Sequence, residues 1–242
     1  MTYRYLAGLL LLGALGACRK QPEAQPMSTT LTETADWYIL RAPEAREIVA
    51  VTGDLDGTLL LTTAFNVYRT TDRGATWTTT RPSNLGIFGF LTRRDTVFTL
   101  TTGRGALADT TTIYAQHPTD YTTDQGRTWQ RYQYTSSSAS FFEAKVPLNR
   151  VRTPSGTTYY VATEREPTAP NSSSFYVLNK GIDGPSGRVL NLPQTHQVRS
   201  LYLDKQARLY VAASAPMCGQ GKNFTFCGEQ NGLLYISKKP LP

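Results

Sequence analysis

Short segments rich in Val, Ile, Leu, Tyr, Phe and Thr recur from Trp37 to the end of the chain, and Gly, Pro, Asn or Asp separate them. None of these segments shows the periodic apolar spacing that an amphipathic helix requires. Short strands with turn residues at regular intervals are typical of an all-β sandwich, barrel or propeller. The pattern therefore predicts an all-β fold.

The strand-like segments group into four units along the chain. The first unit contains EIVAVT, GTLLLTT, NVYRTT and TWTTT, and the second contains IFGFLTR, TVFTLTT, TIYAQ and TWQRYQY. The third contains NRVRT, TTYYVATE, SSFYVLN and GRVLNLP, whereas the fourth, with VRSLYLD, ARLYVAAS and GLLYISKK, lacks its last strand. The segment ADWYILRA at 35–42 is suited to that place, where it would remove an exposed sheet edge. We therefore predict a β-propeller of about four blades, closed by this N-terminal strand, with five blades as the alternative.

One motif occurs twice, as YRTTDRGATW at 68–77 and as YTTDQGRTW at 121–129. Its two Asp residues are 52 positions apart, which is close to the length of a four-stranded propeller blade. Asp and Thr can hydrogen-bond to nearby backbone, Gly permits a positive φ, and Trp can cover apolar surface. We therefore predict a structural role in a hairpin turn for the shared residues, which are Thr70, Asp72, Gly74, Thr76, Trp77, Thr122, Asp124, Gly126, Thr128 and Trp129.

The two copies resemble the Asp-box, or BNR, repeats of sialidases, sortilin-type receptors and a photosystem assembly factor, all of which are β-propellers. The resemblance implies that these turns lie on the face away from the ligand sites of known family members. A sialidase also needs an arginine triad, a Tyr nucleophile activated by a Glu, and an acidic Asp. Only LRAP, with Arg41 and Pro43, is similar to the early Phe/Tyr-Arg-Ile-Pro segment of that family. We therefore assign no catalytic residue and keep a sialidase-like glycoside hydrolase as an alternative function.

The start of the chain has the pattern of an export signal. Arg4 precedes an apolar run at 6–17 that is shorter than the roughly 20 residues of a membrane-spanning helix. The sequence LGAC at 15–18 resembles the lipobox of bacterial lipoproteins. The resemblance implies a signal peptide at 1–17 and a lipid on Cys18, and several acyl chains together give stable anchoring.

The next segment, 18–34, is rich in Pro, Gln and Thr and poor in large apolar residues, so we expect a flexible linker. The propeller domain is expected at 35–242. These expectations place the protein in the bacterial cell envelope, anchored to a membrane and facing the periplasm or the cell exterior.

The chain has 3 Cys residues, of which Cys218 and Cys227 remain if Cys18 carries lipid. An oxidising compartment would allow these two to form a disulfide. The 2 His residues, His117 and His196, lie near neither the cysteines nor a carboxylate cluster, so we expect no metal site and no cofactor. The segment GDLDGT at 53–58 lacks the later carboxylates of a calcium loop and is predicted to be a hairpin turn.

The formal charge is +7, and removal of Arg4 with the signal leaves +6. Arg and Lys are scattered, with no basic run longer than a pair such as Arg93-Arg94. We therefore expect no nucleic-acid partner, and interpret the charge as a solvated basic surface that favours anionic glycans or lipid headgroups.

Long connections between the second and third strands are predicted in three units, at 103–112, 164–173 and 215–232, on the face opposite the repeated motif. Such loops are either a binding site or harmless surface insertions. The candidate binding residues on this face are Arg104, Asp109, Arg165, Lys222, Phe224 and Phe226. The function predicted from the sequence is a binding or scaffold module for a protein or glycan partner. An assembly factor for an envelope or membrane complex is a further alternative.

Overall fold

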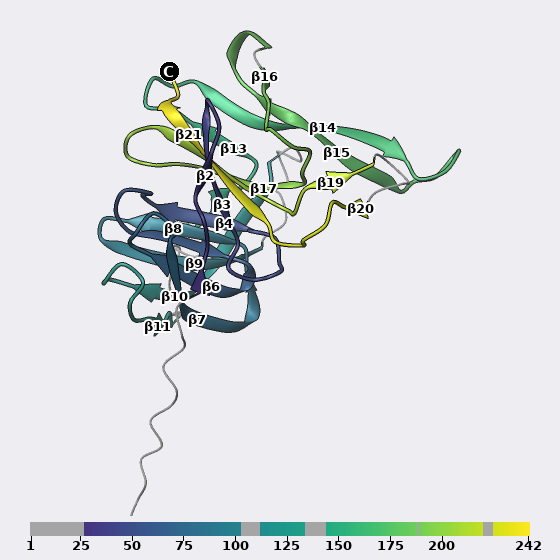
Figure 1. Cartoon of the computed structure of the whole chain (residues 1–242). Coiled ribbons are helices and arrows are strands. Elements are labelled where there is room, and N and C mark those ends of the chain that lie inside the picture. The colour runs from purple at the N-terminus through teal and green to yellow at the C-terminus, as the bar shows by residue number, and fades with distance from the viewer. Residues whose placement is uncertain (1–26, 103–111, 134–143, 188, 220–224) are drawn as a thin grey trace, which may run out of the picture.

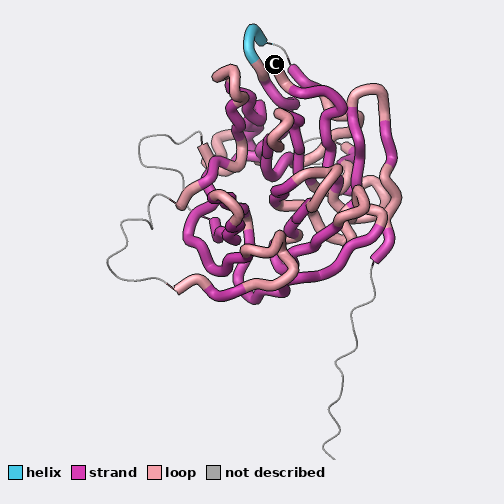
Figure 2. The backbone as a smooth tube through the Cα atoms, turned by 90° about the vertical axis from the view of Figure 1, so that its left-hand side faces the viewer, coloured by secondary structure: helices cyan, strands magenta, loops and turns pink. Residues whose placement is uncertain are grey.

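The computed structural model describes residues 27–102, 112–133, 144–187, 189–219 and 225–242 (Figure 1). Strands dominate this part of the chain, and its one helix is a short 3-10 turn, η1 (Pro185–Gly187). Four sheets are grouped around a common centre (Figure 2). The predicted all-β propeller of four blades is confirmed, and the five-bladed alternative is not.

Blades one and two come first in the chain, and each begins with its innermost strand. Blade one consists of β4 (Ala50–Gly53), β5 (Leu59–Thr62), β6 (Ala64–Thr70) and β7 (Thr76–Ile87). Blade two consists of β8 (Gly89–Arg93), β9 (Thr96–Thr102), β10 (Tyr114–Thr122) and β11 (Gln130–Arg131), and β12 (Val146–Pro147) also pairs with β10.

Blades three and four follow the same order. Blade three consists of β13 (Arg150–Arg152), β14 (Thr158–Pro167), β15 (Phe175–Asp183) and β16 (Val189–Leu190). Blade four contains β17 (Val198–Leu203), β18 (Arg208–Ala213) and β21 (Leu233–Pro240), followed in space by β3 (Trp37–Arg41) and β2 (Thr32–Glu33). A separate two-stranded sheet, β19 (Met217–Cys218) with β20 (Thr225–Phe226), lies between β18 and β21 in the sequence.

The N-terminal strand closes the ring as predicted. β3 pairs antiparallel with β21, so that Leu40 faces Leu234 and Tyr38 faces Ile236. Blade four therefore takes its outer strand from the opposite end of the sequence, and its last C-terminal strand gains a partner instead of an exposed edge.

Residues 27–33, which we expected within the flexible linker, lie on the propeller. β1 (Met27–Ser28) pairs with β7 of blade one, and β2 pairs with β3 of blade four. Met27 and Leu31 also pack against the apolar core between these two blades. Thr29 adds hydrogen bonds to this segment, because its hydroxyl donates to the Gly74 carbonyl and accepts from the Trp77 indole. We call the interface between blades four and one the seam. Residues 27–33 form a strap across it.

The apolar core lies between neighbouring blades. Leu40, Leu59 and Tyr210 belong to a cluster in the seam, and Tyr159 and Leu201 belong to one between blades three and four. The inner strands β5 and β18 are buried on both faces. This explains why they read as continuous apolar runs instead of alternating with polar residues.

The hairpin of β14 and β15 extends beyond the rest of blade three and projects from the body as an arm (Figure 1). We define the arm as residues 163–179. The sequence predicted a long connection at 164–173, but β14 continues to Pro167 and β15 begins at Phe175. The apolar residues of β15 support continued pairing, so only the tip is a loop. In the described part of the chain, no helix is long and apolar enough to cross a membrane.

Candidate functional site

The two copies of the repeated motif form two turns with the same hydrogen bonds. In the first motif turn (residues 70–77), Asp72 accepts hydrogen bonds from the Thr76 N–H at 2.9 Å, the Thr76 hydroxyl at 2.6 Å and the Thr70 hydroxyl at 2.7 Å. The Gly74 N–H donates to the Thr70 hydroxyl at 3.0 Å. Burial alone would raise the pKa of Asp72, but the hydrogen bonds from Thr76 and Thr70 outweigh it and lower that pKa.

The second motif turn (residues 122–129) repeats this geometry. Asp124 accepts from the Thr128 N–H at 2.9 Å and from the Thr122 hydroxyl at 2.7 Å, and Gly126 N–H donates to Thr122 at 3.0 Å. The hydrogen bonds from Thr128 hold the pKa of Asp124 well below its ordinary value. The Asp and Thr side chains of the motif therefore bond within their own turn, whereas the Trp77 and Trp129 indoles donate to Thr29 and Thr80 outside it.

Each motif turn also packs against a neighbouring blade. Gly74 has φ +81°, and a Cβ atom there would lie 2.5 Å from the Leu40 side chain of β3. Gly126 has φ +80°, and its Cβ would lie 2.6 Å from the Leu60 side chain of β5. Only glycine combines this backbone conformation with so close an approach. The turns fasten blades to one another, which argues for a structural role.

The seam holds a cluster of charged residues around Arg208 and Asp204, which are both buried. Arg208, on β18, contacts Asp204 at 2.7 Å, Asp54 at 2.6 Å and Asp56 at 2.7 Å. Asp54 and Asp56 belong to the β4–β5 turn, so this turn joins blade one to blade four. The segment GDLDGT is thus a hairpin turn, as predicted, and its carboxylates bind an arginine.

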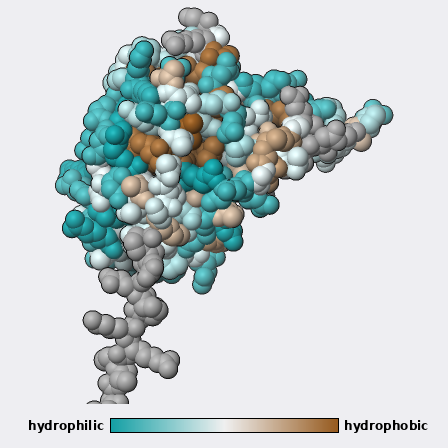
Figure 3. All heavy atoms as spheres, viewed as in Figure 1, coloured by the Kyte–Doolittle hydropathy of each residue, from teal (hydrophilic) through white to brown (hydrophobic). Residues whose placement is uncertain are grey.

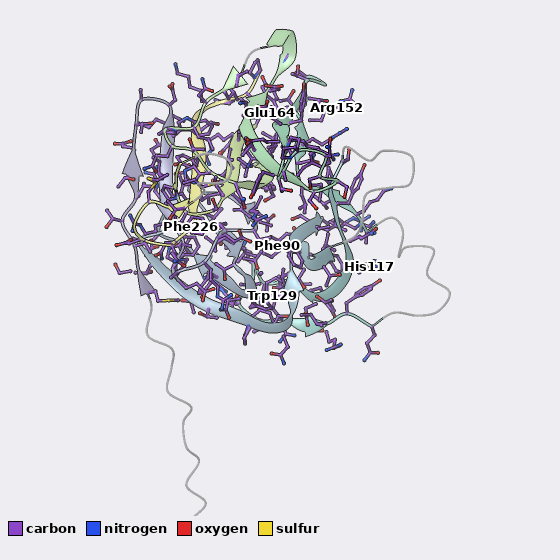
Figure 4. All side chains as sticks on the ribbon, turned by 90° about the vertical axis from the view of Figure 1, so that its right-hand side faces the viewer. Phe90, His117, Trp129, Arg152, Glu164 and Phe226 are labelled. Atoms are coloured by element: carbon purple, nitrogen blue, oxygen red, sulfur yellow. A yellow bond between two sulfur atoms is a disulfide. The ribbon has the colours of Figure 1, made fainter. Side chains whose placement is uncertain are left out.

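The motif turns and the β4–β5 turn lie at the same end of the propeller, which we call the motif face. Thr58 donates to the Gln125 side chain at 3.0 Å, and Arg73 lies 3.2 Å from Asp56. Because the strands are antiparallel, the arm and the β18–β21 connection lie at the opposite end. We call this end the arm face. In the view of Figure 4, Glu164 of the arm lies toward the top and Trp129 toward the bottom.

A cleft of about 930 Å³ opens on the arm face beside blade three. We call it the arm cleft. Its lining residues come from blades three and four, from the segments that lead into them, and from the residue before β10 of blade two. They are Ile113, Asn149, Arg150, Thr158, Tyr160, Val161, Ala162, Thr163, Arg165, Val177, Asn179, Asp183, Gln197, Val198 and Arg199. Apolar and polar residues are mixed where the arm meets the body (Figure 3).

The arm cleft combines exposed apolar side chains with arginines. Ile113, Tyr160 and Val177 are 52%, 44% and 52% exposed. Three arginines line the same cleft, against one carboxylate, Asp183. One of them, Arg199, is paired with Glu47 at 2.6 Å. The cleft therefore offers apolar contact and positive charge together.

One face of the arm forms a wall of this cleft. Arg165 is the cross-strand partner of Val177, and Thr163 is the partner of Asn179, and all four line the cleft. Glu164 does not line the cleft and pairs instead with Lys180 at 2.7 Å. Side chains alternate between the faces of a strand, so the arm separates its charges, with Arg165 toward the cleft and Glu164 away from it.

No protein-family model and no curated protein matches the chain. The similar solved structures include a gluconolactonase from Xanthomonas campestris, at 10% identity over 91% of this chain and 100% of that chain, with a TM-score of 0.35. They also include virginiamycin B lyase from Staphylococcus aureus, at 12% identity over 88% of this chain and 75% of that chain, with a TM-score of 0.29. Likeness this distant carries no conclusion about activity. The assignment of the propeller fold therefore rests on the order of the strands in the sheets. Membership of the Asp-box family and the presence of a lipobox stay predictions.

The predicted site residues have different outcomes. The disulfide between Cys218 and Cys227 is confirmed, and it joins the two strands of the β19–β20 sheet. Arg165 lines the arm cleft, whereas Phe226, on β20 and 36% exposed, does not. Four candidate binding residues lie outside the described residues, and they are Arg104, Asp109, Lys222 and Phe224. The predicted lipidation site, Cys18, also lies outside them.

Sequence reasoning missed most of the arm cleft. Arg150 and Arg199 lie at or near the start of inner strands, and Tyr160 lies within a strand. Each of these positions was assigned to the scaffold of a blade and not to a loop. The signal that could have found Val177 is the run FYVL at 175–178, whose apolar residues do not alternate as a half-buried strand requires.

Blade four contains a buried His–Tyr pair, formed by His196, just before β17, and Tyr235 of β21. The Nδ1–H of His196 donates to the Ser214 carbonyl at 2.8 Å, since a carbonyl can only accept, and Nε2 accepts from the Tyr235 hydroxyl at 2.6 Å. His196 is 3% exposed. Burial lowers the pKa of His196 and raises that of Tyr235. Both side chains are used in hydrogen bonds within blade four.

Tyr68 and Glu44 form a Tyr–Glu pair of the kind that a sialidase needs, but the tyrosine is buried. Burial and then the charge of Glu44 raise the pKa of Tyr68 to about 12. A nucleophile needs a lowered pKa and access to substrate, and Tyr68 is 3% exposed. We assign no catalytic role to this pair. Among the described residues, no group of three or more His, Cys, Asp or Glu side chains is arranged to hold a metal ion.

Proposed function

We propose that this chain is a lipid-anchored, extracytoplasmic β-propeller that binds a protein or glycan partner through the arm cleft. The observation that carries the proposal is a single cleft that brings together three exposed apolar side chains and three arginines on the face opposite the motif turns. Binding sites are commonly concave, with apolar contact area and a few polar groups that fix orientation.

The scaffold beneath the cleft favours this function. The Leu201 N–H donates to the Leu148 carbonyl at 2.7 Å and links β17 to the segment before β13. Tyr159 and Val161 of β14 belong to the apolar core between blades three and four and hold the base of the cleft in place. A rigid base with variable elements at one end is the usual arrangement of a recognition module.

A site-specific cross-link tests the proposal. A photoreactive phenylalanine analogue at Tyr160, in the cleft, is compared with the same analogue at Arg127, exposed on the motif face. In cells that make the full chain, we expect a discrete cross-linked partner from position 160 and none from position 127. Equal products from both positions, or no product from position 160, would contradict a partner in the arm cleft.

Membrane anchoring has a separate test. With Cys18→Ser, which removes the sulfur that the lipobox resemblance assigns to lipid attachment, we expect the chain to leave the membrane fraction. Persistence of the variant in washed membranes would refute the lipoprotein assignment. The prediction does not depend on the partner, because the anchor and the cleft are separate parts of the chain.

The two alternative functions can be tested on the same cleft. Three arginines at one site favour a carboxylate-bearing ligand, so the sialidase alternative predicts hydrolysis of a fluorogenic sialoside that Arg165→Ala weakens. We expect no hydrolysis, because Tyr68 is buried with a raised pKa. The assembly-factor alternative predicts that the partner cross-linked at position 160 is a subunit of an envelope or membrane complex.

A further inference from the structure

The outer edge of the arm is open. β16 pairs only with Ile182 and Asp183 of β15, so the part of β15 from Phe175 to Gly181 has no strand partner on that side among the described residues. An open edge presents backbone N–H and C=O groups that can pair with another chain.

The two strands of the arm differ in how their edges are protected. Within the arm, β14 carries Glu164, Arg165 and Glu166 followed by Pro167. Charged residues and proline are the devices by which natural proteins prevent edge pairing. β15 carries none of them over 175–178, where the sequence is FYVL, and Phe175 and Val177 are 47% and 52% exposed. The edge of β15 is left available.

The two strands of the arm are paired with each other along its length. Paired residues extend to Pro167 and Phe175. At the tip, the Thr168 N–H donates to the Ser174 carbonyl at 3.0 Å, and the Thr168 and Ser172 hydroxyls are 2.8 Å apart. A hairpin fixed before binding loses less entropy when a partner adds to it.

The charge of the arm cleft indicates what kind of partner fits. Arg165 lies beside Val177 on the cleft face, and Arg150 and Arg199 line the same cleft. The Glu164–Lys180 pair lies away from it. The whole chain carries +7. Positive charge beside an exposed apolar strand is complementary to an extended segment that carries carboxylates.

We propose that the outer edge of β15, over residues 175–178, accepts an extended segment of a partner protein as an added strand. Acidic side chains of that segment face the arm cleft and Arg165. Main-chain hydrogen bonds supply affinity in this mode of recognition, and side chains at alternate positions supply specificity. The proposal rests on the proposed function and narrows its partner from protein or glycan to a protein strand.

The test uses the folded full chain and a displayed library of random linear peptides. Enriched peptides are expected to carry carboxylates and β-branched or aromatic residues, and their dissociation constants are then measured by fluorescence anisotropy. Val177→Lys and Arg165→Glu should each weaken binding by about tenfold or more, because they charge the strand or reverse the complementary charge. The matched control Glu166→Lys, on the other face of the arm, should change binding less than about twofold.

A second measurement tests strand pairing without changing the protein. Along an added strand, every second backbone N–H points to its neighbour. N-methylation of an enriched peptide at one set of alternate amides should weaken binding by about tenfold, and methylation of the other set should change it little. Equal effects of the two sets would overturn strand addition, whether or not the variants fold.

The remaining outcomes also decide the question. Peptides that bind Val177→Lys as well as the natural chain would overturn the assignment to this edge. Self-association of the chain that Val177→Lys abolishes would make a second copy the occupant and refute the acidic partner. If no peptide binds while the cross-link from position 160 persists, strand addition fails and the proposed function stands. If that cross-link is also absent, the proposed function fails with it.

Discussion

The seam between blades four and one and the arm of blade three are both built from antiparallel strands. They differ in how the strand edges and the charged side chains are paired. In the seam, strand partners come from three parts of the chain, and the buried Arg208 joins carboxylates of two blades. In the arm, β14 and β15 run past their neighbours, and the ion pair of Glu164 and Lys180 has both side chains 58% exposed.

This difference shows how the fold separates stability from recognition. Residues 164–178 belong to none of the apolar clusters, whereas Leu40, Trp77 and Tyr210 share the cluster in the seam. An element that contributes little to the core can keep an open edge and exposed apolar residues without weakening the ring. Changes of the same chemical kind should therefore have large effects at the seam and small effects in the arm.

The largest effect is expected from Arg208→Met. The variant keeps apolar volume but leaves Asp204, whose side chain is fully buried, without its cationic partner. Removing one member of a buried ion pair typically costs about 3–5 kcal/mol. Urea unfolding measures the loss. Arg73→Met, at an exposed pair in the same region, is the control, with about 0–1 kcal/mol expected. Equal losses in the two variants would refute the special role of the seam cluster.

Gly74→Ala tests how the first motif turn fastens the seam. The added Cβ would meet Leu40 at 2.5 Å, and φ is +81°. Backbone strain and overpacking together should cost about 2–4 kcal/mol. Gly57→Ala is the matched control, because its Cβ meets nothing closer than 3.8 Å. We expect Gly74→Ala to bind peptides normally once folded, and a binding defect without a loss of stability would contradict the structural role of the motif.

The pH dependence of stability should report the buried His196. Burial lowers its pKa below the ordinary value of 6.5, so as pH falls below that value the unfolded chain takes up the proton first. The contribution of neutral His196 is complete above pH 6.5 and declines as pH drops toward the folded pKa. The free energy of unfolding of His196→Gln should fall less steeply in this window. Parallel curves for the two proteins would show that His196 is not the group responsible.

The smallest effect is expected from Glu164→Gln in the arm. This change breaks the ion pair between Glu164 and Lys180, in which both side chains are exposed. Exposed ion pairs contribute about 0–1 kcal/mol, so urea unfolding should be almost unchanged. A loss as large as that of Arg208→Met would show that the arm is part of the stabilising core, and the contrast between arm and seam would be wrong.

The sequence predicted the scaffold because local patterns determine it. Four repeated strand units, the closing strand at 35–42 and the Cys218–Cys227 bridge depend on residue type and spacing, and the structure confirms all three. The motif residues were assigned to turns because Asp72 and Thr70 can bond to nearby backbone, and they do so.

The arm cleft could not be predicted in the same way. It joins Arg150, Arg165 and Arg199, which are far apart in sequence and meet only because blades three and four are neighbours. The arm was missed because β14 and β15 extend beyond the neighbouring strands of their blade. In sequence, such an extension is hard to tell from a strand followed by a loop. The strap at 27–33 was missed because Met27 and Leu31 are isolated apolar residues in a polar segment.

Replacement of the arm tests most directly whether recognition is separate from the ring. In this variant, residues 164–178 are replaced by an Asn-Gly turn that joins Thr163 to its partner Asn179. We predict that the free energy of unfolding stays within about 1 kcal/mol of the natural chain, because the arm adds no residue to the core. In the same variant, the cross-link from position 160 should disappear. A stable propeller that still cross-links its partner in full would contradict the account.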